Sequence, residues 1–400
     1  MEESNVFKII YSIFLHPLRR FPGPLTHAAT RLPYCVHLRR GNLPFHIHAL
    51  HAAYGPVVRV APDELTFSSL GAWKDIMGHQ HRAREFGKWG NFYRPVPSSD
   101  EGPRLRRALA YGFSDKAMRE QGPLITRYVN LLVRRLHENC DGGSQGTGHP
   151  FVDNFTTFDL IGDPAFGESG GVMMQTSAFF PGLTKILPKL VLENAKEAKG
   201  NHDALTRAKL ERRVELGKER KSPDTLAKLT DEIRSTFQSE DEININSAGQ
   251  LKYMLAWLNE ALRLYPPTPG GPPRVVPQGG GNIVGNSVPE NTVVSVHMWA
   301  AYHDRSNFTK PFEIRPERHL GDSRFASDKL DMLQPFQAGP RAYLGRNLAH
   351  AEMRTILAPV IYNFDIKLAE DSKDWIGKQK IYCLWNKGPL NVYLTPVSRL

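Results

Sequence analysis

The chain has 400 residues, of which 40% are hydrophobic and 23% are charged, and its formal net charge is +10. This length and composition suffice for one large or two ordinary cores, so a wholly disordered protein and a collagen-like repeat are both excluded. The positive charge permits an acidic partner, but no nucleic-acid motif or clustered basic stripe accompanies it, so nucleic-acid binding is not expected.

An apolar run near the start of the chain, Val6 to Leu15, is bounded by polar residues and followed by Arg19 and Arg20. Its ten residues are too few to cross a hydrocarbon core of about 30 Å. No small-residue cleavage site of a secretory signal follows. The run predicts an interfacial anchor, the remnant of a longer anchor, or an ordinary buried first helix. We expect residues 1–20 to form this short stub ahead of a single domain over residues 21–400.

Side chains that form disulfides or bind metals are sparse. The three cysteines are Cys35, Cys140 and Cys383. No two of them have Cys-x-x-Cys spacing, which argues against a disulfide framework and a structural zinc site and favours folding in reducing surroundings. Close histidine pairs include His48 with His51 and His79 with His81. We predict no metal site at either pair.

The periodicity of apolar residues predicts mostly helices. Alternation over residues 57–69 predicts a pair of strands, and a further strand is expected over residues 292–296. Helical patterns are found, in chain order, over residues 104–109, 122–139, 195–237, 251–264 and 345 to about 364. The chain is therefore expected to be mainly α with small β-sheets, an α+β fold.

Three segments of the carboxyl half carry motifs in a fixed order. Glu260 and Arg263 lie three residues apart, so both fall on one face of the expected helix, within reach of an ion pair. The second segment is Phe-Glu-Ile-Arg-Pro-Glu-Arg at residues 312–318, and the third is Pro-Phe-Gln-Ala-Gly-Pro-Arg-Ala-Tyr-Leu-Gly at residues 335–345. In this order they resemble the cytochrome P450 family of haem-thiolate monooxygenases. Within that family the residues of these segments most resemble the fungal secondary-metabolism branch, typified by isotrichodermin hydroxylase.

The resemblance implies roles for individual residues. A buried structural triad is implied for Glu260, Arg263 and Arg318. The residues implied in haem binding are Arg107, Arg274, Phe336, Gly339, Arg341 and Gly345. Tyr343 occupies the position of the family's cysteine ligand to the haem iron. It is either an iron ligand or a solvent-facing or packed tyrosine in a loop without iron. A phenolate ligand supports O–O cleavage less well than a thiolate does.

The chain departs from the family in two stretches. The family's helix I, whose Ala/Gly-Gly-x-x-Thr relays protons to oxygen, should lie between the segments 205–220 and 226–233. Residues 221–224 join these segments directly, and no oxygen-activating threonine remains. The stretch before residue 104 is also shortened. We expect a cytochrome P450 fold that lacks most of helix I, with internal deletions near residues 100–104 and 168–225.

Two hypotheses on function remain open from the sequence. One is an active haem-dependent monooxygenase that hydroxylates a terpenoid or polyketide, with a faulty gene model. The other, favoured by the missing ligand and helix, is an inactive homologue. The resemblance implies haem as cofactor, a small lipophilic substrate, and NADPH-cytochrome P450 reductase as partner of an active enzyme. It implies weak membrane association at the cytosolic face of the endoplasmic reticulum, or a soluble cytoplasmic protein if the stub does not anchor.

Overall fold

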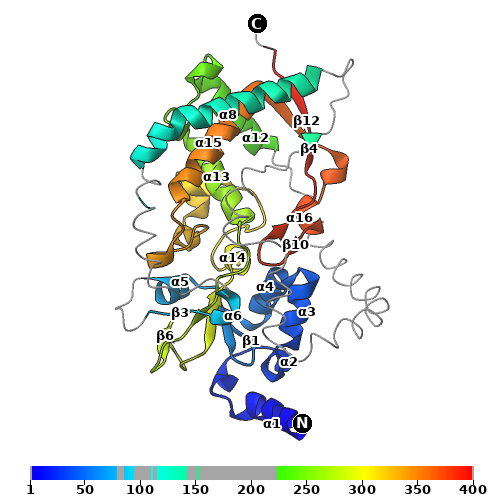
Figure 1. Ribbon diagram of the computed structural model, residues 1–400, viewed down its shortest axis with the longest axis vertical. Coiled ribbons are helices and arrows are strands. Elements are labelled where there is room, and N and C mark those ends of the chain that lie inside the picture. Colours follow the sequence, from blue (N-terminus) through cyan, green and yellow to red (C-terminus); the bar gives the residue numbers. More distant parts are fainter. Residues whose placement is uncertain are drawn as a thin grey trace.

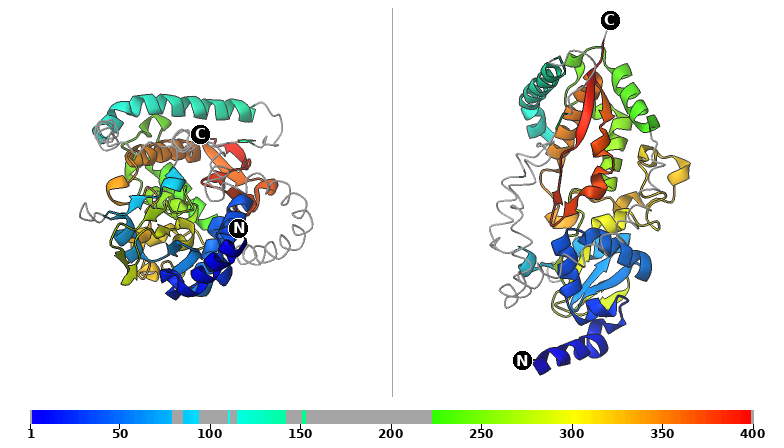
Figure 2. Two further views of the ribbon diagram at one scale, coloured as in Figure 1. Left: turned by 60° about the horizontal axis from the view of Figure 1, so that its bottom comes forward. Right: turned by 90° about the vertical axis from the view of Figure 1, so that its right-hand side faces the viewer.

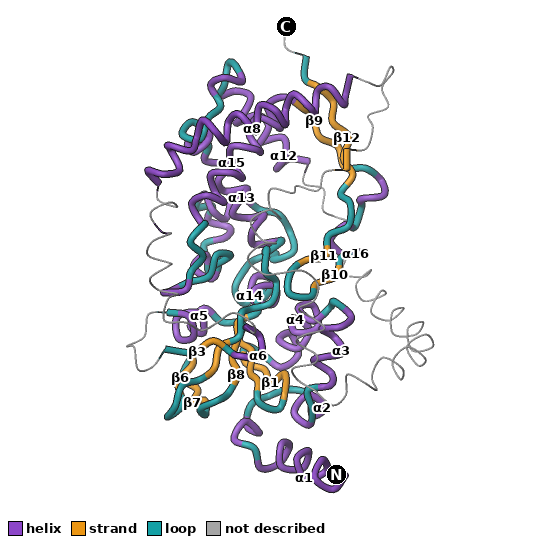
Figure 3. The backbone as a smooth tube through the Cα atoms, in the orientation of Figure 1, coloured by secondary structure: helices purple, strands orange, loops and turns teal. Residues whose placement is uncertain are grey.

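The computed structural model describes residues 2–78, 85–93, 110, 115–141, 151–152 and 223–398. The molecule is elongated, with its first helix at one end and its C-terminus at the other (Figures 1 and 2). The amino-terminal helices and strands fill one half together with the strands of residues 281–296, and the longer helices gather in the other half (Figure 3).

The helices differ widely in length. They are α1 (Glu2–Ile10), α2 (Leu25–Ala29), α3 (Leu32–Arg40), α4 (Leu43–Tyr54), α5 (Leu70–Met77), α6 (Gly90–Tyr93), α8 (Asp115–Asp141), α12 (Pro223–Thr236), α13 (Lys252–Leu264), α14 (Met298–Tyr302), α15 (Arg346–Asn363) and α16 (Trp375–Lys378).

The strands form small separate sheets. A five-stranded sheet has the order β1 (Val57–Ala61), β2 (Glu64–Phe67), β8 (Val293–Val296), β5 (Arg274–Val275) and β3 (Gly87–Lys88). The others pair β4 (Phe151–Val152), β12 (Asn391–Pro396) and β9 (Phe364–Leu368); β6 (Gly281–Ile283) and β7 (Asn286–Val288); and β10 (Lys380–Ile381) and β11 (Trp385–Asn386). In the first sheet β2 runs parallel to β8, with Glu64 opposite Val293, so this sheet joins the amino-terminal part of the chain to its carboxyl half.

The longer helices pack through apolar faces. Helix α8 lies across α15 (Figure 1), where Val129 and Val133 belong to the same buried cluster as Ile356 and Val360. A second cluster joins α12 to α13 and α15 and includes Ile233. Because these faces are buried against each other, α12, α13 and α15 form a layer on which α8 packs through α15.

The predicted strand pair is confirmed as β1 and β2, but the expected alternation of buried and exposed residues is wrong. Every residue of β2 is buried, including Glu64, which pairs with Arg31. In β1 the guanidinium of Arg59 is buried and donates to the backbone oxygen of Ser12 at 2.9 Å. Partners from the preceding segment thus allow polar residues of both strands to be buried.

The apolar run near the start forms α1 and one turn of π-helix over Tyr11–Leu15. Its side chains face outward: Phe7 is 76% exposed, Phe14 62% and Leu15 64%. The alternative of an ordinary buried first helix is therefore wrong. In the part of the chain that the structure describes, no helix has the length and apolarity needed to cross a membrane.

The predicted fold class, mainly α with small β-sheets, is confirmed. The helices expected over residues 251–264 and from 345 correspond to α13 and α15, and the late strand corresponds to β8. The helix expected over residues 104–109, the shortened stretch near 100–104 and nearly all of the stretch 168–225 lie outside the described residues.

Buried histidines make the fold sensitive to acid. Burial lowers the pKa of His297 to about 3 and that of His51 to about 4. Both groups bind a proton in the unfolded chain at a higher pH than in the folded one, so folding loses stability as the pH falls below about 6.5. As the pH falls from about 6.5 towards the lowered pKa of each group, that group should reduce the free energy of unfolding by about 1.4 kcal/mol per pH unit.

Urea denaturation between pH 7.5 and 4.5 measures this loss. A His51→Gln variant should show a shallower dependence on pH, since one titrating group is removed. A urea midpoint that stays constant over the whole range would contradict the expectation.

Candidate functional site

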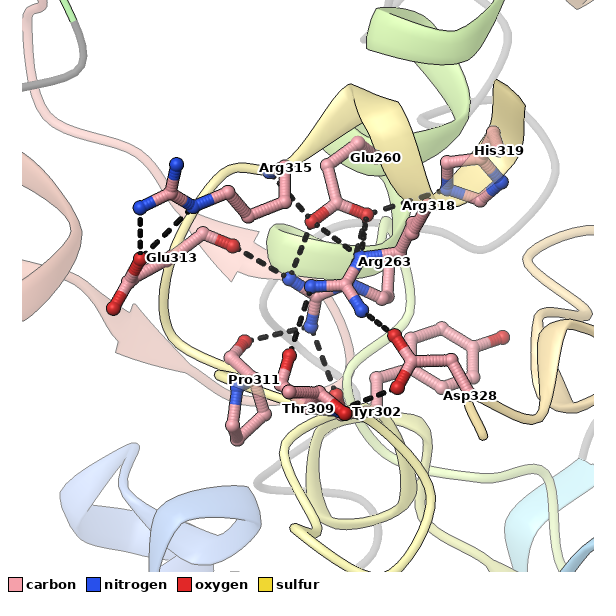
Figure 4. Close-up of polar contacts among 10 residues, drawn as sticks. All are labelled: Glu260, Arg263, Tyr302, Thr309, Pro311, Glu313, Arg315, Arg318, His319 and Asp328. Atoms are coloured by element: carbon pink, nitrogen blue, oxygen red, sulfur yellow. Dashed lines mark hydrogen bonds and ion pairs between the residues drawn. The ribbon is translucent and has the colours of Figure 1, made fainter. Parts of the chain in front are cut away.

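The carboxylate of Glu260, on α13, lies at the centre of a buried charge cluster (Figure 4). Arg263, one helical turn further along, donates to both carboxylate oxygens, from Nη2 at 2.8 Å and from Nε at 2.9 Å. Arg318, on the short 3-10 helix Pro316–Leu320, donates from Nε to the same carboxylate at 3.0 Å. All three side chains are fully buried. The structure thus brings together the three residues of the expected triad.

The guanidinium of Arg263 uses every donor it has. Besides the two bonds to Glu260, Nη1 donates to the backbone oxygens of Tyr302 and Pro311 at 3.0 and 2.6 Å. Nη2 also donates to the oxygen of Glu313 at 3.1 Å. A guanidinium has five N–H donors, and five are satisfied here. Arg263 therefore fixes the loop after α14 against α13.

Two members of the cluster were not predicted from the sequence. Asp328 forms an ion pair with Nη1 of Arg318 and accepts from the backbone nitrogen of Thr309 at 2.7 Å. His319 lies with Nε2 3.3 Å from Glu260. Neither has a diagnostic spacing, although His319 directly follows the Pro-Glu-Arg segment. With Asp328 included, the cluster has two carboxylates for two guanidiniums and can remain charged while buried.

The pKa of Glu260 reports the balance of this cluster. Burial by itself would raise the pKa, but Arg263, the hydrogen bond from His319 and Arg318 outweigh it and lower the pKa to about 2. Glu260 is therefore ionised at every pH at which the protein would be handled.

The loop before α15 carries the residues implied in haem binding. The backbone nitrogen of Tyr343 donates to the oxygen of Phe336 at 2.8 Å and closes the loop. Gly339 has φ +72°, and a Cβ there would overlap the backbone oxygen of Met77 on α5. A Cβ on Gly345 would lie 2.7 Å from the ring of Tyr343. The glycines therefore allow the loop to approach its neighbours closely.

Tyr343 itself packs as an aromatic side chain. Its ring lies nearly parallel to that of Phe336, at an interplanar angle of 17° and a centroid distance of 6.3 Å. Burial, and then the negative charge of Glu352, raise the pKa of its hydroxyl. Both effects disfavour the phenolate, which is the form that would ligate iron.

Cations gather near the other implied haem-binding residues. On the paired strands β3 and β5, Lys88 lies opposite Arg274, and Arg274 is buried. Arg274 donates to the hydroxyl of Tyr93 at 3.3 Å. Arg341 is close enough to repel the positive charges of both Arg274 and Lys88, and Arg274 repels Lys88 in turn. The carboxylate of Glu85 lies 3.8 Å from Arg341. Like charges opposite each other on neighbouring strands are unfavourable, and a bound anion relieves this repulsion.

These residues fit one part of haem and not another. The cations beside Tyr93 have the chemistry needed to bind its carboxylates. Arg107, also implied in that role, lies outside the described residues. At Tyr343 the loop supplies a phenol whose raised pKa keeps it in its neutral form, at the position where the resemblance implies a thiolate. Among the described residues, no group of three histidine, cysteine, aspartate or glutamate side chains is arranged to hold a metal ion.

Comparison with known proteins agrees with the motifs. The family model described as Cytochrome P450 matches residues 220–392. The chain is 39% identical to a cytochrome P450 monooxygenase, tpeC, of Talaromyces stipitatus, over 98% of this chain and 93% of that protein. It is 38% identical to prhB of Penicillium brasilianum and to the trichothecene C-15 hydroxylase of Fusarium sporotrichioides, in both cases over 98% of this chain and 96% of the relative.

The alignments also contain many positions that have no counterpart in this chain. The alignment with prhB spans 470 positions, whereas this chain has 400 residues. At least 70 positions within it therefore have no residue in this chain. Since the alignment reaches nearly both ends of the relative, these positions are internal.

The buried cluster predicts a large effect of removing one guanidinium. Arg263→Met removes two of the hydrogen bonds to the carboxylate of Glu260 and three to backbone oxygens, so the free energy of unfolding should fall by about 3–5 kcal/mol. Urea denaturation followed by circular dichroism measures the change. The control is Arg135→Met, which removes an exposed ion pair with Glu138 and should change little. Equal effects of the two substitutions would contradict the assigned role of Arg263.

Proposed function

The chain belongs to the cytochrome P450 family, in its fungal secondary-metabolism branch, and we propose that it is a member that does not catalyse monooxygenation. The observation that carries the proposal is Tyr343 at the position of the iron-ligating cysteine. A cysteine thiolate donates electron density to iron and promotes O–O cleavage, and a phenol that stays neutral provides no such donation. The family's cofactor, haem, supplies the oxygen chemistry when it is bound through that thiolate.

The surroundings of Tyr343 support this proposal. Its ring is packed against Phe336, and its hydroxyl is kept protonated by burial and by Glu352. None of the three cysteines of the chain lies in the loop over residues 335–345. A thiolate from Cys35, Cys140 or Cys383 would have to come from another part of the chain. The frame of the loop is therefore compatible with the family, while its ligand is not.

The shortened stretch, where the family has the helix that relays protons to oxygen, supports the proposed inactivity independently. The sequence joins the segments 205–220 and 226–233 through residues 221–224, where the family has a helix with Gly-x-x-Thr. The positions of the prhB alignment that have no residue in this chain together outnumber the residues of such a helix. Without a threonine at that place, no side chain of this stretch would relay protons.

The cations near Tyr93 support a residual affinity for an anionic group. Arg274 and Arg341 would hold carboxylates, and Arg107 is the third residue that we assign to this role. Phe336, Gly339 and Gly345 would shape the surface on which a flat ring system rests. We expect this affinity to be low, because neither an iron ligand nor the missing helix would retain the bound group.

One observation favours a second candidate, an active haem-dependent monooxygenase that hydroxylates a terpenoid or polyketide. The missing positions are internal, and both ends of the relatives are matched. An exon omitted from the gene model would produce this pattern. Sequencing of the transcript across the codons for Lys221 to Thr225 decides between the candidates: a transcript that encodes a Gly-x-x-Thr helix there, with a cysteine codon at 343, supports the active enzyme. NADPH-cytochrome P450 reductase would then be its partner.

The absence of thiolate chemistry can be measured directly. The purified chain, mixed with haemin, reduced and exposed to carbon monoxide, should give no thiolate-type Soret band and no reductase-dependent hydroxylation, because no thiolate faces the iron. Tyr343→Cys supplies the ligand alone. We expect poor haem retention in this variant, since the oxygen-side helix is still missing. Tyr343→Phe is the matched control and should behave as the unmodified chain does.

A thiolate spectrum from the unmodified chain would refute the proposal, since it would require a distant cysteine to reach the iron. Full recovery of hydroxylation in Tyr343→Cys would show that the ligand is the single defect, and it would refute the assigned loss of the oxygen-side helix.

The N-terminal arm, residues 2–15, is proposed to associate weakly with membranes at the cytosolic face of the endoplasmic reticulum. Phe7, Phe14 and Leu15 are exposed, and Lys8 and Arg19 flank them. We expect binding to anionic vesicles at low ionic strength that is lost at high salt, since apolar insertion and charge attraction contribute together. Vesicle sedimentation measures it. Phe7→Ser should weaken binding, while Leu320→Ser, at an exposed position elsewhere, should not. Carbonate-resistant membrane integration would contradict weak association.

A further inference from the structure

Three histidines from three successive short helices meet near the start of the fold. His27 lies on α2, His37 on α3 and His46 on α4. The rings of His37 and His46 stack nearly parallel, at an interplanar angle of 7° and a centroid distance of 3.6 Å. The ring of His27 lies beside the same His46, at a centroid distance of 5.1 Å and an interplanar angle of 24°. Three short helices thus contribute one imidazole each to a single cluster.

Two of these imidazoles point their outer nitrogens at each other. The Nε2 atoms of His27 and His46 are 3.0 Å apart. With both rings neutral, one Nε2 must carry the proton and donate to the other. This arrangement places two ring nitrogens, one donor and one acceptor, against each other, and His27 is buried.

The pair His27 and His46 has no negatively charged partner among the described groups that shift its pKa values. Burial, with contributions from the other imidazoles, lowers the pKa of His27 to about 4 and that of His46 to about 3. The described residues that act electrostatically on these two rings are themselves histidines, and no carboxylate is among them. Both rings are therefore neutral near pH 7, which is the form in which imidazole binds metals.

We propose that His27 and His46 form a two-imidazole site for a borderline divalent cation of the zinc type. Zinc–nitrogen bonds of about 2.0–2.1 Å at a tetrahedral angle place two nitrogens about 3.3–3.4 Å apart. The observed separation of 3.0 Å needs to open by only a few tenths of an ångström. Imidazole nitrogens bind zinc, copper and nickel in preference to magnesium or calcium.

The neighbouring groups can accommodate the proton and orient the rings. When the cation replaces the hydrogen bond, the proton on the donating Nε2 moves to Nδ1 of the same ring. In His27 that atom lies 3.4 Å from the hydroxyl oxygen of Thr26, which can accept from it. His37 is held by a 3.0 Å contact between its Nδ1 and Oδ1 of Asn42, and it stacks on His46 rather than pointing at the pair. Solvent would therefore complete the coordination.

The position of this site gives it a structural consequence. Helix α2 precedes β1 and contacts the N-terminal arm, and α4 packs against α14 and β1. A cation shared by His27 and His46 would tie α2 to α4. The proposal does not depend on haem binding or on the identity of the iron ligand.

Isothermal titration of the full-length chain, freed of any histidine tag, with zinc chloride tests the proposal. We expect one equivalent of zinc at this site, and His27→Gln and His46→Phe should each weaken its binding at least tenfold. His46→Phe keeps an aromatic ring for stacking on His37 and removes only the nitrogens. His137→Gln is the matched control, because His137 lies on α8 against Phe364, and it should bind as the unmodified chain does. Magnesium chloride should give no heat of binding.

A second measurement locates the site without substitutions. Zinc should protect His46 from diethyl pyrocarbonate in the unmodified chain, as mapped by mass spectrometry. Absence of zinc binding, binding that survives His46→Phe, or protection confined to other histidines would each overturn the proposal. The pair would then be a hydrogen-bonded packing contact only.

Discussion

The buried carboxylate of Glu260 is the constraint on which the carboxyl half of the molecule depends. A lone carboxylate in this position would be costly, so Arg263 and Arg318 must both reach it, and this requirement brings α13 against the segment around residue 318. Arg263 also holds the backbone oxygen of Tyr302, whose hydroxyl accepts from the nitrogen of Gln334 at 2.8 Å. Gln334 directly precedes the loop that carries Tyr343. The position of the candidate site thus follows from the charge cluster.

The sequence predicted those contacts that depend on local spacing. Glu260 and Arg263 share a helix face, and the resemblance added Arg318, so the meeting of these three could be anticipated. Asp328 could not, because it reaches Arg318 only through the fold of the intervening turn. The same limit applies to β2: alternation predicted the strand, but the burial of Glu64 depends on Arg31, which belongs to a different element. Local pattern therefore predicts elements better than it predicts the partners of their charges.

The cations near Tyr93 show a further limit of sequence reasoning. Arg274 and Arg341 were assigned through motifs, whereas Lys88 belongs to no motif and enters the group through the pairing of β3 with β5. The histidine pair is a stronger case. Helix α3 and the turns at its two ends separate His27 from His46, so no helical or strand spacing could have predicted their contact. Convergence of several short helices is a property of the tertiary structure alone.

Tyr343 shows how far the fold of a loop can be independent of the chemistry that the loop supports. The loop is closed by the backbone bond from Tyr343 to Phe336 and by the approach of Gly339 to α5, and neither contact involves the side chain at position 343. A cysteine or a tyrosine can therefore occupy the position without altering the backbone path. Because the charge cluster and the loop are satisfied by their own contacts, this part of the fold does not depend on the chemistry of the side chain at position 343.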